Sequence, residues 1–121
     1  MLHLSPSCRY YLYREQTDMR KGFDSLSGIV AKQMNLSVLN GDIFIFINKK
    51  RNQVKLLLFE GDGFAVYHKR LEKGTYELPV GDNSHKAMTV SSQQLQLILQ
   101  GISLKTVRHR KRYQHTAQSC G

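Results

Sequence analysis

The stretch "GDIFIFINKKRNQVKLLLFEGDGFAVYHKRL", residues 41–71, decides the fold. It holds three largely apolar segments in succession, at 43–47, 54–59 and 64–71, with branched and aromatic side chains. Segments of this kind, separated by short polar loops, are typical of neighbouring antiparallel strands. Because every residue of 43–47 is apolar, we expect that strand to be covered on both faces.

The turn "EGDG" at residues 60–63 determines how the second and third segments pair. With these residues in the turn, Phe59 lies opposite Phe64 and Lys55 lies opposite His68. Aspartate tolerates a tight turn, and Gly63 is expected to supply the positive φ that such a turn needs. Both faces of this hairpin are then largely apolar near the turn, as expected for a hairpin in the centre of a sheet.

Glu60 and Asp62 are therefore interpreted as turn residues and not as a catalytic or metal-binding pair. A metal or phosphoryl-transfer site needs a third oxygen ligand or a nearby base, and neither Asp42 nor Asp82 has a spacing that supplies one. The serines and glycines also lack the strand–turn–helix context of a nucleophile or a phosphate-binding loop. We expect no enzyme activity, no metal site and no cofactor.

Basic side chains gather at the other end of the same hairpin. The loops 48–52 and 68–74 should lie together, about 20 Å from the acidic turn at about 3.3 Å per residue. The bases in these loops are Lys49, Lys50, Arg51, Lys69, Arg70 and Lys73. Tyr67 and Tyr76 lie among them in the sequence, which suits base stacking beside phosphate contacts. The alternative interpretation is a solvated rim of loops.

The flanking segments predict the remaining elements. "YYLYRE" (10–15) reads as a strand, and the apolar positions of 19–34 recur at helical spacing, with Thr17 or Asp18 as the N-cap. "TYEL" (75–78) is expected to form a short edge strand. Ser91 and Gln94 fit a capping box that opens a short helix ending at Gly101.

These elements define an α+β fold in one domain. We expect an antiparallel β-meander of four to five strands packed by the helix near 19–34, followed by a short C-terminal helix. The domain spans residues 1–104, and residues 105–121 form a basic, flexible tail with almost no apolar periodicity.

The charge of the chain is large and unevenly distributed. The 121 residues include 18 Lys and Arg against 9 Asp and Glu, a formal net charge of +9. Residues 83–121 hold six bases and no acid, and so carry two thirds of this excess. The tail bases are Lys105, Arg108, Arg110, Lys111 and Arg112. Such a chain attracts nucleic acid or an acidic protein surface, with anionic membrane a weaker option.

The rest of the composition indicates a soluble protein of the reduced cytoplasm. Cys8 and Cys120 lie near opposite ends and show no metal-ligand spacing, so neither a disulfide nor a zinc site is expected. The first residues lack the pattern of a signal peptide, because Arg9 interrupts any apolar run. No stretch approaches the roughly 20 apolar residues of a membrane span.

Three segments together resemble a known family: "TDMRKGFDSLSGIV" (17–30), "GDIFIFINKKRNQVKLLLFEGDGFAVYHKRLEKGTYELP" (41–79) and "GISLKTVRHRKRY" (101–113). They are similar to TnpB, the accessory protein encoded by the second open reading frame of the insertion-sequence family numbered sixty-six. Phe59 and Leu78 stand where Trp is expected in many relatives, so the resemblance does not carry an aromatic-stacking role over to these two positions. The matching recurrent positions are Asp18, Met19, Arg20, Lys21, Gly22, Phe23, Phe46, Asn48, Lys55, Leu56, Gly61, Gly63, Lys69, Arg70, Leu71, Gly74 and Pro79.

The resemblance implies a bacterial mobile-element protein that assists transposition beside a separate transposase. Two functions are consistent with it. In the first, the protein is a non-enzymatic accessory factor that contacts element DNA through the basic loop end and the tail. In the second, it is an adaptor that docks onto the transposase without touching DNA. A nuclease is a distant third, and the oligomeric state is open because an edge strand can pair between chains.

Overall fold

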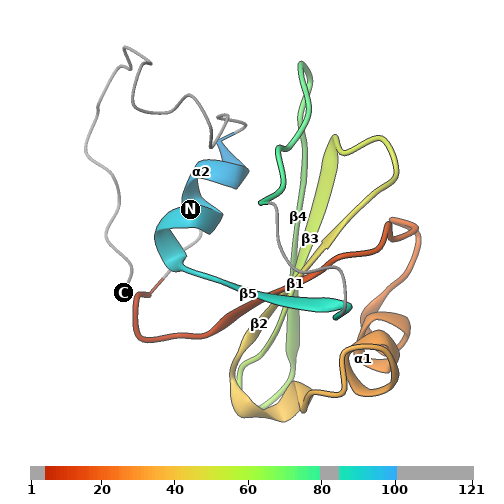
Figure 1. Cartoon of the computed structure of the whole chain (residues 1–121). Coiled ribbons are helices and arrows are strands. Elements are labelled where there is room, and N and C mark those ends of the chain that lie inside the picture. Colours follow the sequence, from red (N-terminus) through yellow and green to blue (C-terminus); the bar gives the residue numbers. More distant parts are fainter. Residues whose placement is uncertain (1–4, 80–84, 101–121) are drawn as a thin grey trace.

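The strand Ile43–Ile47 (β2) lies in the middle of the sheet, and all five of its side chains are buried, as its sequence predicts. The computed structural model describes residues 5–79 and 85–100. These residues form a five-stranded sheet in the order β4-β3-β2-β1-β5 (Figure 1). Besides β2, its strands are β1 (Tyr10–Tyr13), β3 (Gln53–Phe59), β4 (Phe64–Arg70) and β5 (Ala87–Val90).

The hairpin register predicted from the sequence is confirmed. β3 and β4 are antiparallel, with Phe59 opposite Phe64 and Lys55 opposite His68. The Glu60 N–H donates to the carbonyl of Gly63 at 2.8 Å and closes the turn. The glycine with positive φ is Gly61, at 96°, so the assignment of that conformation to Gly63 is wrong.

β1 corrects the expected all-antiparallel meander. It pairs with β2 in parallel, Tyr10 opposite Ile43, and with β5 antiparallel, Tyr10 opposite Val90. The connection from β1 to β2 contains the helix α1 (Phe23–Lys32), and a strand reached through such a crossover runs in the same direction as the first. The α+β class is retained, but the sheet is mixed.

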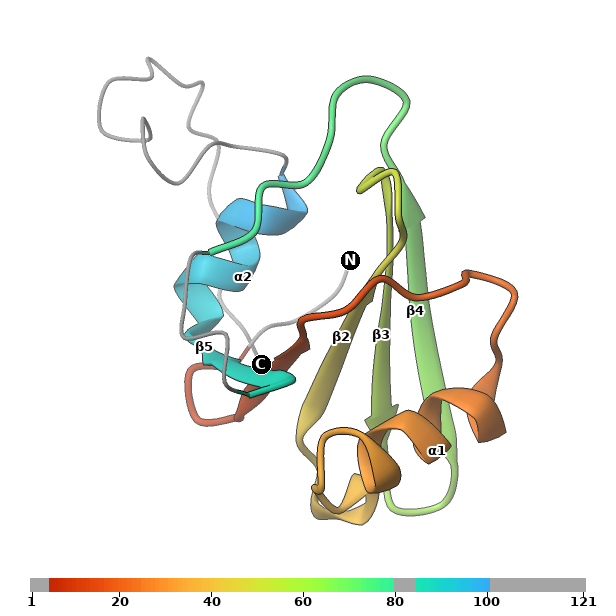
Figure 2. The ribbon, with the colours of Figure 1, turned by 45° about the vertical axis from the view of Figure 1, so that its right-hand side comes forward.

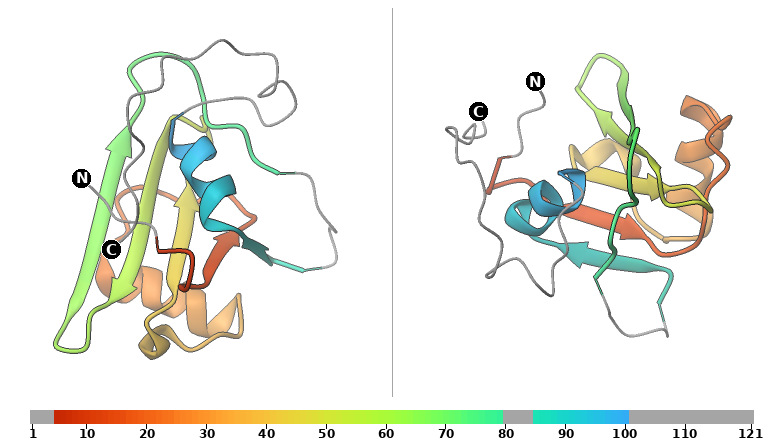
Figure 3. Two further views of the ribbon diagram at one scale, coloured as in Figure 1. Left: turned by 90° about the vertical axis from the view of Figure 1, so that its left-hand side faces the viewer. Right: turned by 90° about the horizontal axis from the view of Figure 1, so that it is seen from above.

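Helices cover both faces of the sheet (Figures 2 and 3). On one face α1 buries Leu26 and Val30 against Phe44, Phe46 and Leu57. On the other face lie α2 (Ser92–Leu99) and the segment 71–79; the α2 residues packed there are Leu95, Ile98 and Leu99. The alternating side chains of β2 therefore enter two separate cores, which explains why a strand of this kind is apolar throughout.

The start of α1 differs from the prediction. The helix begins at Phe23, four residues later than expected, and its N-cap is Gly22, which makes no side-chain capping bond. Thr17 and Asp18 lie upstream in a turn instead, because the Thr17 N–H is bonded to the end of β2 and the Asp18 carboxylate to Arg20. A short 3-10 helix, Val38–Asn40, follows α1 before β2.

Residues 75–78 are not a strand, contrary to the prediction. The Tyr76 N–H donates to the carbonyl of Arg51 at 2.6 Å, and the side chain enters the core with 1% of its surface exposed. The last strand of the sheet is β5 instead, which the sequence reading missed.

The capping box is confirmed, because the Ser91 hydroxyl accepts from Gln94 and the Gln94 side chain accepts from Ser91. Gly101, the 104/105 domain boundary and the tail fall outside the described residues.

Candidate nucleic-acid interface

The loop between β2 and β3 is held rigidly by one asparagine. The Asn48 Oδ1 atom accepts from the N–H groups of Asn52 at 3.0 Å and Gln53 at 2.9 Å. Its Nδ2 atom donates to Asn52 Oδ1 at 2.8 Å. Three side-chain bonds thus close a loop whose exposed residues include Lys49 and Lys50. The two ammonium groups project from a fixed backbone.

Arg51 in the same loop adopts the left-handed conformation, with φ of 59°. This region is uncommon for residues other than glycine, asparagine and aspartate, and persists where the surroundings enforce it. Two backbone hydrogen bonds hold Arg51 in this conformation. The Arg51 carbonyl accepts from the Tyr76 N–H, and the Asn52 carbonyl accepts from the Leu71 N–H at 2.7 Å. The segment after β4 therefore braces the basic loop from the α2 side.

A second basic turn, residues 17–21, lies against this loop. The Thr17 N–H donates to the carbonyl of Ile47 at 2.9 Å, where β2 ends. The Asp18 carboxylate then accepts from the backbone of Arg20 at 2.9 Å and from its guanidinium at 2.7 and 3.1 Å. This two-point contact holds the pKa of Asp18 well below its ordinary value. Asp18 therefore fixes the orientation of the Arg20 guanidinium, and its carboxylate stays charged at neutral pH.

Between the turn and the loop lies an open groove of about 740 Å³, lined by residues 16–21, 48–50 and 53. Its charged side chains are Asp18, Arg20, Lys21, Lys49 and Lys50, a net charge of +3. Thr17 also lines the groove. This side chain is 3% exposed, and its hydroxyl has no hydrogen-bond partner within the described part of the chain.

A smaller hollow of about 190 Å³ lies beside the same loop and includes Tyr13, Arg51 and Leu78 in its lining. It shares Gln16, Asn48 and Lys49 with the groove, so the two hollows adjoin one another at the β2–β3 loop and at Gln16. The loop is therefore exposed to solvent on both sides, and its bases are open to a large partner.

The end of β4 extends the basic surface on the α1 side. The His68 Nε2 atom lies 2.9 Å from Gln53 Oε1, and Lys55 donates to the carbonyl of Lys21 at 2.9 Å. Arg70 forms an exposed salt bridge with Glu72 at 3.0 Å. The pKa of His68 lies below its ordinary value, because the ring is partly buried and the positive charges of Lys55 and Arg70 are nearby. This imidazole is therefore neutral at pH 7.

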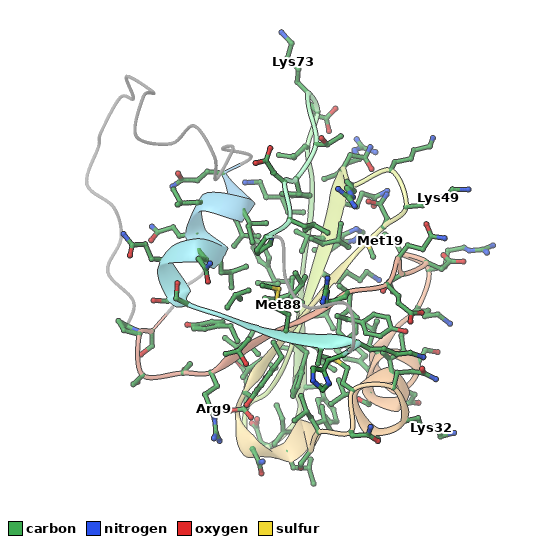
Figure 4. The ribbon with its side chains drawn as sticks, in the orientation of Figure 1. Arg9, Met19, Lys32, Lys49, Lys73 and Met88 are labelled. Atoms are coloured by element: carbon green, nitrogen blue, oxygen red, sulfur yellow. The ribbon has the colours of Figure 1, made fainter. Side chains whose placement is uncertain are left out.

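The six bases predicted to cluster do lie at one end of the sheet, but not on one surface. Lys69 is on the α2 face, where its ammonium donates to the carbonyl of Leu99 at the end of α2, at 3.0 Å. Lys73 projects from the tip of the loop after β4, away from Lys49 (Figure 4). The groove therefore contains Lys49 and Lys50, with Arg51 in the adjoining hollow and Arg70 on the β4 end. The tail bases lie outside the described residues.

The aromatic part of the predicted interface is corrected. Tyr76 is buried, and burial raises the pKa of its hydroxyl to about 12, so this ring has no face available to a nucleic-acid base. Tyr67 is partly buried and packs against the core on the α2 side. The surface that remains is suited to phosphate contact by cations rather than to stacking.

Reasoning from periodicity missed Arg20 and Lys21. The helical spacing of 19–34 predicts that they lie in the first turn of a helix, whereas they lie in the turn before it, across the groove from the β2–β3 loop. The available signal was the run "DMRKGF", which matched the family pattern in full although charge and spacing gave it no role.

The acidic turn lies at the end of the hairpin away from these bases, as predicted. Within residues 5–79 and 85–100 no group of three or more His, Cys, Asp or Glu side chains is placed to hold a metal ion. No helix in that part of the chain is long and apolar enough to cross a membrane.

Comparisons with known proteins agree with the resemblance seen in the sequence. Residues 8–109 match the family model described as IS66 Orf2 like protein. "Uncharacterized protein y4hO" of Sinorhizobium fredii is 31% identical over 102 residues, covering 84% of this chain and 87% of that protein. "Uncharacterized protein y4jC" of the same organism is 24% identical over 110 residues, covering 91% and 92%. No solved structure matches.

The family match covers both turns of the groove, the hairpin and the whole described sheet. It therefore confirms the resemblance that the motifs "DMRKGF" and residues 41–79 predict. The chain belongs to the IS66 Orf2-like family, whose members act as accessory proteins of insertion-sequence transposition.

Proposed function

We propose that this protein assists transposition by binding DNA through the groove between residues 17–21 and 48–53, together with the basic tail. The observation that carries the proposal is the juxtaposition of Arg20, Lys21, Lys49 and Lys50 along the groove. Two segments far apart in the sequence supply these charges, and the hydrogen bond from Thr17 to Ile47 joins them. A fixed set of cations along a groove is what a phosphate backbone requires.

The local bonding suits phosphate oxygens. The guanidinium of Arg20 is oriented by Asp18, while its side chain remains 91% exposed. Lys49 and Lys50 sit on a loop whose backbone is already ordered by Asn48, so less conformational entropy is lost on binding. The contacts are to phosphates and not to base edges, and we therefore expect strong salt dependence with weak sequence preference.

The alternative is an adaptor that docks onto the transposase through the same charges. DNA is favoured because the groove is lined by cations and polar groups, with Met19 as its one large apolar side chain within the described residues. Protein interfaces depend instead on a buried cluster of aromatic and aliphatic anchors. The same surface charges nevertheless allow an acidic protein partner, and the experiment separates the two.

The test is a titration of the full-length protein with duplex DNA at two salt concentrations, using element ends and random sequence. Lys49→Gln and Lys50→Gln are each compared with Lys32→Gln, which removes the same charge from the exposed end of α1, far from the groove (Figure 4). Each groove variant should flatten the slope of log K against log salt by about 0.9, the value for one lost phosphate contact. Lys32→Gln should leave that slope unchanged.

Deletion of residues 105–121 tests the tail separately, and it should weaken binding and flatten the salt slope further. Equal losses for the groove variants and for Lys32→Gln would show that only net charge matters and would remove the groove from the proposal. Absence of DNA binding together with salt-sensitive co-purification with the transposase would establish the adaptor instead.

A further inference from the structure

The strand β4 forms an edge of the sheet, and half of its backbone groups face outward. The Glu60 N–H bonds to the Gly63 carbonyl, and the Leu71 N–H to the Asn52 carbonyl. Hydrogen-bonded pairs alternate with non-bonded pairs along an antiparallel ladder. Ala65, Tyr67 and Lys69 therefore bond to β3. The N–H and C=O groups that point away from the sheet belong to Phe64, Val66, His68 and Arg70.

Along residues 64–70 this edge lacks several of the features that usually protect an exposed strand. Its seven residues pair with β3 without a break in register, so there is no bulge, and it contains no proline. Lys69, the one lysine on β4, points its ammonium at Leu99 on the α2 face. The opposite edge strand, β5, is only four residues long. A long regular edge of this kind is a template for another strand.

We propose that a second copy of this chain pairs with β4 in antiparallel orientation, with Val66 of one copy opposite Val66 of the other. The pairing is isologous, because the same strand is used on both sides of a twofold axis. It is compatible with the ladder, since Val66 carries an outward N–H and an outward C=O. The two sheets then continue into one another across the interface.

Charge complementarity is compatible with this register. With Val66 at the centre, Phe64 lies opposite His68 of the second copy, and Asp62 lies opposite its Arg70. Asp62 and Arg70 are both exposed, and the twofold axis creates this ion pair twice. Because His68 is neutral at pH 7, its ring can lie over Phe64 without burying a charge.

On the opposite face of the sheet, the sizes of the side chains that face one another also fit this register. Along that face Gly63 comes opposite Lys69, and Ala65 comes opposite Tyr67 of the second copy. Each large side chain therefore meets a small one, which avoids crowding between non-hydrogen-bonded pairs. Tyr67 and Lys69 keep their places against the α2 side.

Other registers and other occupants fit less well. If the twofold axis passes through Tyr67, Arg70 lies opposite Phe64 and the ion pair with Asp62 is lost. If the axis passes through His68, the two imidazoles of the dimer face one another. The chain's own tail has five bases at 105–112 and no acid, so it would bring like charge to the basic end of β4. A second copy would instead bring its acidic turn, with Asp62, to this end, where Arg70 already forms an exposed pair with Glu72.

The first test measures association of the full-length protein without DNA by sedimentation equilibrium. We expect a dimer with a micromolar dissociation constant, as for a small interface. Asp62→Arg and Arg70→Asp should each raise that constant by at least about tenfold, because each sets like charges opposite one another twice. The double variant Asp62→Arg/Arg70→Asp restores the pair in reversed order and should return the constant to within about twofold of the original.

The second test isolates the outward backbone donor. His68→Pro removes the N–H that would bond to Phe64 of the second copy, and β4 keeps its bonds to β3 because that N–H faces outward. His68→Ala removes the side chain and keeps the N–H. We expect His68→Pro to abolish the dimer and His68→Ala to retain it, with unchanged circular dichroism in both.

Amide exchange gives an independent readout on the unmodified chain. The N–H groups of Val66 and His68 should become protected as concentration rises through the dissociation constant, while those of Ala65 and Tyr67 stay protected throughout. A monomer at 100 µM, a concentration about tenfold above a dissociation constant on the order of 10 µM, would overturn the proposal. So would a dimer that survives both single charge reversals, or one that the double reversal fails to restore.

Discussion

The backbone N–H of Thr17 donates to the carbonyl of Ile47 at 2.9 Å, and this bond joins the two halves of the basic groove. Ile47 is the last residue of β2, and the next residue along, Asn48, begins the basic loop. Thr17 opens the turn that carries Arg20. Because the bond links the chain after β1 to the end of the neighbouring parallel strand, the groove depends on the mixed topology of the sheet.

The first prediction concerns the Thr17 hydroxyl, which is buried without a partner in the described structure. Thr17→Val replaces it with a methyl group of similar shape. The free energy of unfolding should stay the same or rise by up to about 1 kcal/mol, because no hydrogen bond is lost and an unsatisfied polar group is removed.

DNA affinity should move in the opposite direction. In the proposed DNA complex a phosphate oxygen would accept from this hydroxyl, so Thr17→Val should weaken binding by about threefold to tenfold, the worth of one such bond. Thr17→Ser keeps the hydroxyl and is the control. Urea unfolding and a binding titration check the pair, and a clear loss of stability in Thr17→Val would show that the hydroxyl is bonded in the free protein.

The second prediction tests the asparagine that closes the basic loop. Asn48→Ala removes three side-chain hydrogen bonds and leaves the Asn52 and Gln53 N–H groups without their acceptor. We expect a loss of about 2 kcal/mol in the free energy of unfolding. Asn48→Asp keeps the acceptor oxygen and should lose less. Asn40→Ala, at an exposed site, is the matched control, and a loss equal to that of Asn48→Ala would refute the bracing role.

The third prediction separates structure from binding at Lys69. Lys69→Met keeps the length of the side chain but removes the donor to the last turn of α2. The protein should lose about 0.5–1 kcal/mol of stability, as expected for a cation at a helix C-terminus. Its DNA affinity should fall no further than that of Lys32→Gln. A selective loss of affinity at full stability would instead place Lys69 among the DNA contacts.

The parts of the fold that follow local rules could be predicted from the sequence. The register of β3 and β4 follows from the four-residue turn, because a side-chain period of two leaves one pairing that is apolar on both faces. The capping box at Ser91 and the burial of β2 are likewise set by residues close together in the chain.

The parts that failed are set by contacts between distant segments. "TYEL" has strand propensity, yet Tyr76 bonds to Arg51 and fills the core instead. The parallel pairing of β1 with β2 depends on which sheet position the chain reaches after α1. Arg20 lines the groove because the turn that carries it is bonded to the end of β2, a segment distant in the sequence. Net charge identified the basic end of the hairpin, but only the tertiary structure shows that Lys69 faces away from it.

The last prediction is a pH dependence of stability. The pKa of His68 is lower in the folded protein than in the unfolded chain, because burial and the positive charges of Lys55 and Arg70 disfavour the protonated ring. Above the unfolded value, near 6.5, both states are neutral at this site and it contributes no pH dependence. As the pH falls below that value, the unfolded chain takes up a proton that the folded protein resists, so stability decreases until the folded pKa is passed.

His68→Gln should remove this part of the decline while it leaves the stability at pH 8 little changed. The measurement is the urea midpoint between pH 8 and pH 5, at a protein concentration low enough to keep the chain monomeric. His85→Gln, at an exposed histidine outside the sheet, is the control and should retain the decline of the original protein. If His68→Gln loses stability in parallel with the original chain as the pH falls, burial and the nearby cations do not lower the pKa of His68 in the folded protein.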